Sequence, residues 1–290
     1  MEKIKVLIGS PIRQSPNILR EFLESLLELE QGDMEYTFIF VDDNDNEEAS
    51  RLLQDFQTQR PTILLSVPEN EKKRGAYLVN HITHYWGEHL VWKVAKFKDL
   101  IIANALKGGY DYLFLVDSDL VLHPATLKHL ISTQKDIISE IFWTSWYPCS
   151  PELPNVWLYD KYDMVRRERG ETLTKEEEER RVQEFLDQLR VPGIYEVGGL
   201  GACTLISRKA LLAGVSFSEI RNLTLWGEDR HFCVRALALG LSLWVDTHYP
   251  AYHIYRESLL AGVEEFKARC KKDMQAGQET SHSGSQFTAD

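Results

Sequence analysis

Two carboxylates stand one residue apart at the end of an apolar, strand-forming run, in the segment YDYLFLVDSDLVLHP (residues 110–124). An unpaired buried charge is costly to desolvate, so Asp117 and Asp119 are expected to have a partner of opposite charge. Side chains alternate along an extended chain, which places both carboxylates on the same side. Two hard oxygen ligands on one side suit Mg²⁺ or Mn²⁺, with the phosphates of a substrate as further ligands. The alternative is that both aspartates cap the loop at the end of the strand.

Other side chains capable of chemistry end a strand or open a helix. Asp42 and Asp43 end the run YTFIFVDD, and Glu228 and Asp229 open the segment GEDRHFCVRALALG. Acids at a helix N-terminus are also stabilised by the helix dipole, so this second pair has a structural alternative. His253 ends the apolar run YPAYH, where a core histidine is the alternative to a ligand. Whether these residues can act together depends on where the fold places them.

The elements that must position these residues alternate between strands and helices in the first half. Patterns typical of strands cover residues 4–9, 36–43, 62–67 and 111–119, and helical spacing covers residues 15–30, 47–57 and 91–109. Ser15 followed by Pro16 is a helix start. This alternation predicts an α/β fold with a mainly parallel sheet flanked by helices. Such sheets bind ligands at the carboxyl ends of their strands, where the acidic pairs fall.

The second half is less regular. Strands are expected at residues 136–144 and 241–255, and helices at 174–189 and 226–240, around a glycine-rich segment at 195–211. Thr174 and Glu177 have the spacing of a capping box. Because no repeat or linker interrupts the chain, one domain is expected over residues 1–275. The polar residues 276–290 are expected to form a disordered tail.

Composition limits the classes of partner. The 290 residues are 43% hydrophobic and 27% charged, as in ordinary globular proteins, and the net charge of −11 disfavours nucleic acid as a partner. Four scattered cysteines without a CxxC pair indicate reduced thiols in a cytoplasm. No apolar run approaches the length of a transmembrane segment.

Taken together and in this order, the motifs resemble those of nucleotide-sugar-dependent glycosyltransferases of the GT-A fold, especially the inverting family two. The pieces are VLIGSPIR, FVDDND, a basic helix before the acidic strand, FLVDSDLVLHP, GGLGACTLISRKAL, WGEDRHFCVRALALG and VDTHYPAYH. The resemblance covers roughly residues 3–256. It implies a Rossmann-like GT-A domain in which residues 1–125 form the nucleotide-binding half and residues 126–275 form an irregular acceptor-binding half.

The resemblance also implies roles for most of the candidates. The DSD segment would hold Mn²⁺ or Mg²⁺ on the diphosphate of a donor that we predict to be a UDP-sugar. His253 would be a further metal ligand, with His248 as a weaker candidate. Asp229 would be the catalytic base, with Glu228 beside it. The residues that the resemblance places at the nucleotide and the donor are Pro11, Arg13, Asp42, Asp43, Asp117, Ser118 and Asp119.

Three further features are assigned less directly. The basic residue that is common in the helix before the DSD strand is replaced by the segment AKFKD, in which either Lys96 or Lys98 would supply the contact. Gly199 and Gly201 would let the backbone approach the donor sugar or the acceptor closely, with a tight turn as an equal alternative. Trp226 flanks the acidic pair and is expected near the site, to stack on a sugar face or a lipid acceptor, with a place in the core as the alternative.

The expected reaction is therefore transfer of a sugar to an acceptor hydroxyl with inversion. The acceptor is a glycan, a lipid, a protein or a small molecule, and a lipid acceptor would bring this cytoplasmic enzyme to a membrane surface. One alternative is a Mg²⁺-dependent phosphatase of the haloacid dehalogenase type, since VDSDLV also fits its DxDx[TV] pattern with Asp117 as nucleophile. Another is a non-catalytic protein that binds a nucleotide sugar or a glycan, which would gain support if Asp229 pointed into the core.

Overall fold

The computed structural model describes residues 3–72, 78–79, 84–85 and 87–283. Its centre is a mixed sheet whose strands lie in the order β11 (Ile194–Val197), β14 (Leu243–His253), β8 (Ile137–Thr144), β13 (Thr204–Ser207), β6 (Tyr112–Leu115), β1 (Ile4–Ile12), β2 (Met34–Asp42) and β3 (Thr62–Ser66). The strands from β3 to β6 are parallel, and β14 is parallel to β8. Only β13 and β11 run against their neighbours in this order of described strands. The predicted α/β class with a mainly parallel sheet is confirmed.

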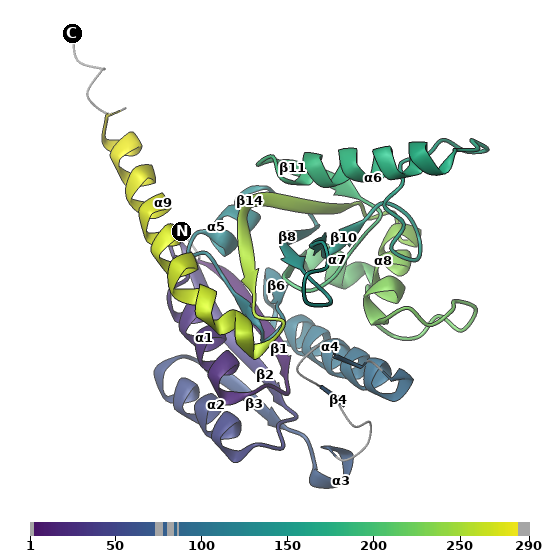
Figure 1. Cartoon of the computed structure of the whole chain (residues 1–290). Helices are drawn as coiled ribbons and strands as arrows, with labels where there is room; N and C mark the ends of the chain where they lie inside the picture. The colour runs from purple at the N-terminus through teal and green to yellow at the C-terminus, as the bar shows by residue number, and fades with distance from the viewer. Residues whose placement is uncertain (1–2, 73–77, 80–83, 86, 284–290) are drawn as a thin grey trace.

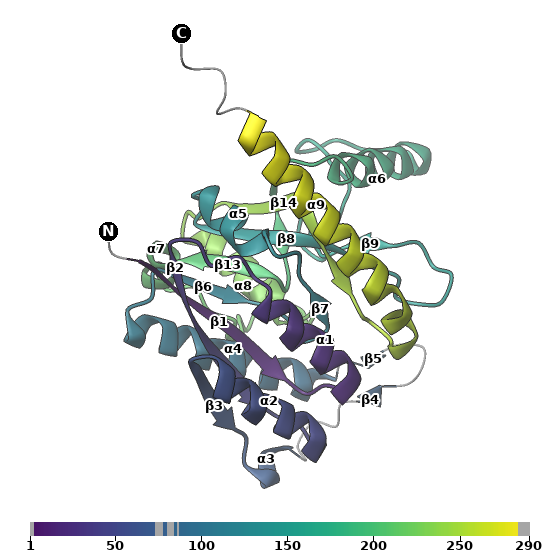
Figure 2. The same cartoon turned by 90° about the vertical axis from the view of Figure 1, so that its left-hand side faces the viewer.

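Helices cover both faces of the sheet (Figures 1 and 2). One face carries α1 (Pro16–Leu27), α2 (Glu47–Gln59) and α5 (Thr126–Ser132), and the other carries α4 (Glu88–Gly108), α7 (Arg208–Ala213) and α8 (Glu228–Ala238). Alternation along β1 decides which layer each side chain joins. Leu7 packs in the core with Ile101 of α4, whereas Val6 and Ile8 pack in the core with Phe22 of α1. Strand β1 is therefore buried on both faces, as interior parallel strands are.

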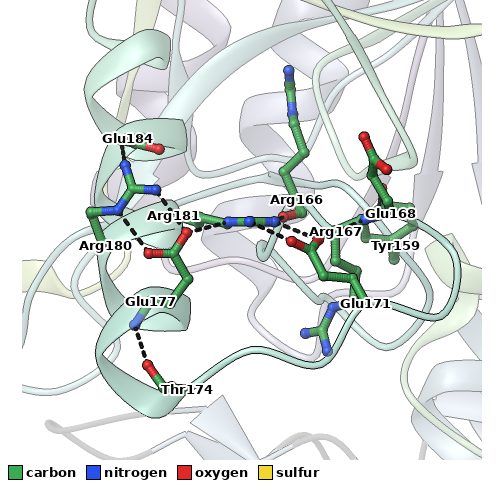
Figure 3. A network of polar contacts seen from close by, with 10 residues as sticks. All are labelled: Tyr159, Arg166, Arg167, Glu168, Glu171, Thr174, Glu177, Arg180, Arg181 and Glu184. Atoms are coloured by element: carbon green, nitrogen blue, oxygen red, sulfur yellow. Dashed lines mark hydrogen bonds and ion pairs between the residues drawn. The ribbon is translucent and has the colours of Figure 1, made fainter.

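Local sequence signals account for the helix starts. Helix α1 begins at Pro16 after the N-cap residue Ser15, as predicted. Helix α6 (Lys175–Leu189) follows Thr174, whose hydroxyl accepts a hydrogen bond of 3.2 Å from the backbone N–H of Glu177. The Glu177 carboxylate pairs with Arg181 in a surface network of charged side chains (Figure 3). One half of the predicted capping box is thus present, and the Glu177 side chain is used for this network.

Shorter elements complete the described chain: α3 (Glu69–Lys72), β4 (Leu78–Val79), β5 (His84–Tyr85), β7 (Leu120–Val121), β9 (Leu153–Pro154), β10 (Val156–Trp157), β12 (Gly199–Leu200) and the 3₁₀ helix η1 (Glu257–Gly262). Among the described helices, none combines the length and the apolar character that a membrane span requires.

The final helix, α9 (Val263–Ser283), differs from the disordered tail expected from residue 276 onward. Its first turns are anchored because Phe266 packs with Ile18 of α1. Once a helix is nucleated in this way, each added residue contributes one more backbone hydrogen bond, so the polar residues after it continue the helix. Residues 284–290 lie outside the described residues.

Candidate active site

A cleft lies at the carboxyl ends of β1, β2 and β6, the edge at which parallel sheets bind ligands. The side chains that line it are Pro11, Ile12, Arg13, Gln14, Asp43, Leu90, Val94, Phe97, Lys98, Asp117, Ser118, Asp119 and Glu228. An adjoining hollow shares Pro11, Lys98 and Asp117 with this cleft and extends to Asp229. The fold thus brings together most of the residues that the motifs single out, from segments far apart in the sequence.

Strand pairing brings together Asp119 and His253, which lie far apart in the sequence. Strand β7, which follows the DSD segment, pairs with the end of β14, so that His253 lies opposite Leu120. The His253 Nε2 atom lies 3.4 Å from the Asp119 Oδ2 atom. The other ring nitrogen of His253, Nδ1, lies 2.8 Å from the Thr144 hydroxyl. The histidine is therefore held between the DSD segment and the end of β8.

This arrangement fits a divalent ion. A hydrogen bond at one ring nitrogen of a histidine orients the other nitrogen, as it does in metal sites. Asp117, which lines the cleft beside Asp119, adds a second carboxylate. Two carboxylates and an imidazole form a donor set suited to Mg²⁺ or Mn²⁺, so Asp117, Asp119 and His253 are the residues that would hold the ion.

Lys98 joins the acidic pair at the start of α8 to the cleft. Its Nζ atom lies 2.8 Å from the Glu228 Oε1 atom and 3.0 Å from the Asp229 Oδ1 atom, and its side chain is only 4% exposed. Burial disfavours the charged form of Lys98, but the carboxylates of Asp229, Glu228 and Asp117 outweigh this and hold its pKa well above the usual range. Lys98 is therefore held in its charged form by the carboxylates around it.

The pKa values of Asp229 and Asp117 are raised. Burial raises the pKa of Asp229 to about 7, although Lys98 lowers it, and the nearby Glu228 and Asp117 carboxylates add to the rise. Burial is also the main cause of the raised pKa of Asp117, where Lys98 again acts in the opposite direction. A pKa near neutrality suits a group that takes up a proton during a reaction. The Asp229 side chain is 23% exposed, so a substrate has access to it.

The two predicted glycines and the tryptophan have different surroundings. A Cβ atom at Gly201 would lie 2.6 Å from the Asp229 Oδ2 atom, so a glycine is required for this carboxylate to keep its place. Gly199 instead packs against Trp157, where a Cβ atom would lie 2.0 Å from the ring. This contact gives Gly199 a packing role, which differs from both predicted alternatives, the approach to a substrate and the tight turn. Trp226 is 50% exposed, and it is not among the described residues that line the cleft or the adjoining hollow.

Basic side chains surround Asp43 at the other end of the cleft. Its carboxylate lies 2.7 Å from the Lys93 Nζ atom and 3.7 Å from an Arg13 guanidinium nitrogen. Burial raises the pKa of Asp43, and Lys93 and Arg13 act to lower it. Asp42 has a local role instead, because its Oδ1 atom accepts hydrogen bonds from the backbone and side-chain amides of Asn44.

Helix α4 resolves the choice between the two lysines of AKFKD. Lys98 lines the cleft, whereas Lys96 is exposed. Position 98 follows Leu90 and Val94 at intervals of four residues and so shares their helix face, and position 96 does not. The four-residue spacing of Leu90, Val94 and Lys98 is therefore a signal in the sequence that favours Lys98 over Lys96 as the residue in the cleft. Lys93, which binds Asp43, lies outside the AKFKD segment and was missed for that reason.

Tyr162 lies near Asp229 and belongs to no motif. Its ring centroid is 6.3 Å from that of Trp226, and burial and then the negative charge of Asp229 raise its pKa well above the usual range. The turn that presents it is anchored by Asp160, which accepts hydrogen bonds of 2.5 and 2.8 Å from the Arg230 guanidinium of α8. These contacts join segments 70 residues apart, so no local pattern predicts them.

Comparisons with known proteins bear on the fold. No protein-family model and no curated protein sequence matches the chain. Among solved structures, it is similar to S. aureus TarS 1–349 (TM-score 0.51, 12% identity, 86% of this chain and 60% of that chain) and to the same protein in complex with UDP-GlcNAc (TM-score 0.50, 14% identity, 88% and 60%). It is also similar to the mannosyltransferase PcManGT from Pyrobaculum calidifontis in complex with GDP-Man and Mn²⁺ (TM-score 0.50, 11% identity, 87% and 57%).

The chain thus spans about three fifths of the length of these similar structures. At such low identities the likeness establishes the fold and leaves the reaction open. The resemblance to GT-A glycosyltransferases that the motifs indicate is confirmed at the level of the fold.

Proposed function

We propose that the protein is a metal-dependent glycosyltransferase that moves a sugar from a UDP-sugar to an acceptor hydroxyl with inversion. The observation that carries the proposal is that two groups meet at the cleft, where His253 takes part through its contact with Asp119. Asp117, Asp119 and His253 form a donor set suited to an ion on a diphosphate, and Asp229 lies beside them, held by Lys98. The GT-A fold supports the same function.

Each group has a task in this reaction. A divalent ion held by the carboxylates would act as a Lewis acid on the negative charge that grows on the departing diphosphate. Asp229 accepts the proton of the acceptor hydroxyl while the hydroxyl oxygen attacks the anomeric carbon. The new glycosidic C–O bond forms on the face opposite the bond to the diphosphate, which breaks and leaves its electron pair on the diphosphate. Because Lys98 binds the Oδ1 atom of Asp229, the Oδ2 atom near Gly201 is the one that takes the proton.

The choice of donor is part of the proposal. Two of the similar structures contain UDP or UDP-GlcNAc, and another contains GDP-Man with Mn²⁺. We propose UDP as the nucleotide and treat GDP as its competitor. Residues 1–125 would supply the nucleotide side of the cleft. Residues 126–275 would supply the side for an acceptor glycan, lipid, protein or small molecule.

The alternative functions explain less of the site. A non-catalytic binding protein would fit an Asp229 that points into the core, but this side chain is partly exposed and lines a hollow beside Asp117. A phosphatase of the haloacid dehalogenase type normally carries its nucleophile after the first strand, whereas Asp117 follows β6, the fourth strand of the parallel series.

The test is a calorimetric titration of UDP into the purified protein with Mn²⁺, repeated with EDTA and then with GDP. We expect UDP to bind in the presence of Mn²⁺ only, because the carboxylates repel an uncompensated diphosphate. Asp119→Asn should abolish this binding. The matched control is Asp33→Asn, which changes an exposed aspartate in the turn before β2.

Two results would contradict the proposal. If UDP binds equally well with Mn²⁺, with EDTA and to the Asp119→Asn variant, then Asp117, Asp119 and His253 do not hold a metal ion on the diphosphate. Binding of neither UDP nor GDP under any condition would direct the search to phosphatase substrates.

A further inference from the structure

A second cluster of potential metal ligands lies away from the cleft. His129 of α5 and His248 of β14 both approach the carboxylate of Asp246. The His129 Nε2 atom lies 2.9 Å from the Asp246 Oδ2 atom, and the His248 Nδ1 atom lies 3.0 Å from the same oxygen. One ligand atom from each of the three residues lies within 4.8 Å of the other two. His248, the weaker candidate for the ion of the cleft, is thus part of a different group.

The fold builds this cluster from two elements. Asp246 and His248 are two residues apart on β14, which places them on the same face of the strand. The pairing of β14 with β8 shifts register between Asp246 and Ala251, and such an irregularity re-aims the side chains that follow it. Helix α5 supplies His129 from its last turn, and the rings of His129 and His248 lie 4.7 Å apart.

Asp246 is a buried carboxylate that faces two imidazoles. Asp246 is fully buried, and its register partner on β8, Glu140, is fully buried as well. The ion pairs of Asp246 within the described residues are those with His129 and His248, and neither carboxyl has a lysine or arginine partner there. The carboxyl group of Glu140 accepts hydrogen bonds from the backbone of Tyr249 and Ile141 and shares one with the Asp246 carboxylate, so it is a partner of Asp246 within the core.

The distances leave room for one ion after a small adjustment. Zinc bonds of about 2.0–2.2 Å in a tetrahedral site place neighbouring ligand atoms about 3.3–3.6 Å apart. The two ring nitrogens lie 2.9 and 3.0 Å from the Asp246 Oδ2 atom, the length of a hydrogen bond, so each ring would move outward by about 0.3–0.7 Å to admit the ion. The side chains of His129 and His248 are 26% and 36% exposed, which gives an ion a path from solvent and leaves a position for water. The backbone N–H of His248 donates to Asp246 Oδ1 at 2.9 Å and orients the carboxylate, as outer-shell contacts do in metal sites.

We propose that His129, Asp246 and His248 bind a divalent transition-metal ion of the zinc type, which links α5 to β14. Two imidazoles and one carboxylate favour such an ion over Mg²⁺ or Mn²⁺, which prefer the oxygen-rich donor set of the cleft. The two sites are separate. Glu140, beside Asp246, and Thr144, beside His253, are four positions apart on β8, a spacing of roughly 13 Å. The proposal therefore does not depend on the glycosyltransferase reaction.

The test counts the metal that the full chain retains. The protein is stripped with a chelator, incubated with Zn²⁺ and an excess of Mg²⁺, passed through a desalting column and analysed for zinc by mass spectrometry. We expect the wild type to retain one zinc ion that His129→Gln and His248→Gln do not retain. Competition with a zinc-binding dye should show affinity about 100-fold or more weaker in both variants.

Two controls locate the ion. His89→Gln removes an exposed histidine outside the cluster, and Asp119→Asn removes a ligand of the cleft. Both should retain the zinc ion. Circular dichroism verifies that each variant is folded, and the more exposed His248 provides a test even if the His129 variant does not fold.

The outcomes separate the two proposals. Equal zinc content in the wild type and in both histidine variants would overturn the second site. Loss of zinc in Asp119→Asn alone would also overturn it, because the ion would then lie in the cleft. A failure of UDP to bind would overturn the proposed reaction and leave this zinc count unchanged.

Discussion

Two groups of charged side chains in this protein pair acidic with basic residues in different surroundings. The buried ion group lies in the cleft and consists of Lys98, Glu228 and Asp229. The surface ion network lies along α6 and consists of Glu171, Glu177, Arg180 and Arg181 (Figure 3). In the first group burial raises the pKa of an aspartate to about 7. In the second, hydrogen bonds from arginine lower the pKa of both glutamates to about 2.

The difference shows that burial determines whether an acid of this protein has a pKa near neutral pH. At the surface both glutamates stay charged at neutral pH, and the network attaches a loop to α6. Arg181, for example, binds both Glu171 and the backbone oxygen of Arg166. In the cleft, desolvation raises the pKa of Asp229 close to neutral pH, where the carboxyl group exchanges its proton readily. Five predictions test this contrast, from the largest expected effect to the smallest.

Asp229→Asn should lower the rate of sugar transfer by about 10²–10⁴-fold, the contribution of a general base, while metal-dependent UDP binding is kept. Single-turnover kinetics and calorimetry measure the two effects. Glu184→Gln, which changes an acid of α6, is the control. Turnover near the wild-type level in the Asp229 variant would move the base elsewhere, with Glu228 as the next candidate.

The pH profile of the wild type gives the same assignment a second test. An aspartate with a raised pKa is protonated below that pKa and is a base only above it. We therefore expect kcat/KM to rise with pH and level off above about 7, the pKa of Asp229 in the free protein. A profile that stays flat between pH 5 and pH 8 would contradict a base with this pKa.

Lys98→Met should lower the free energy of unfolding by about 3–5 kcal/mol, because it leaves the buried carboxylates without their cation. The same change should shift the rise in kcat/KM to higher pH, since Lys98 acts to lower the pKa of Asp229. Denaturant titration measures the first effect. Lys96→Met, on an exposed face of the same helix, is the matched control. Equal losses of stability in the Lys98 and Lys96 variants would contradict the central role of Lys98. If the Met variant does not fold, Lys98→Arg keeps the positive charge, and its pH profile then tests whether the geometry of the lysine contact sets the pKa of Asp229.

Gly201→Ala should reduce kcat by about 10²-fold without weakening UDP binding, because the added methyl group displaces the carboxylate of Asp229. Gly87→Ala is the control, since no atom lies within 4 Å of a Cβ at that position. A Gly201 variant with wild-type kcat would show that Asp229 does not act from its present position.

Arg181→Ala should have the smallest effect. Exposed ion pairs are worth little and are screened by salt, so the melting temperature should fall by a few degrees at most, and by less at high ionic strength. Sugar transfer should be unchanged. A loss of transfer comparable to that of the Lys98 variant would remove the distinction between the two groups.

The sequence predicted the sheet, its flanking helices and most of the residues along the cleft. The periodicity of the strands and helices is enough to place Asp43, Asp117 and Asp119 at one edge of the sheet. The motifs left Lys96 and Lys98 undecided, although helix geometry separates these two positions. They also missed Lys93, and they contain no signal for Tyr162, whose contacts depend on a distant turn that has no pattern of its own.

What the sequence determined by itself is the order of strands and helices and the residue types at the strand ends, since these follow from local periodicity and from the costs of burying charge. Only the tertiary structure decided which charges are buried together. Burial, and with it the raised pKa of Asp229, the cation at Lys98 and the meeting of His129 with Asp246, arises from contacts between distant segments. Desolvation is a property of the folded surroundings, and no short stretch of sequence contains it.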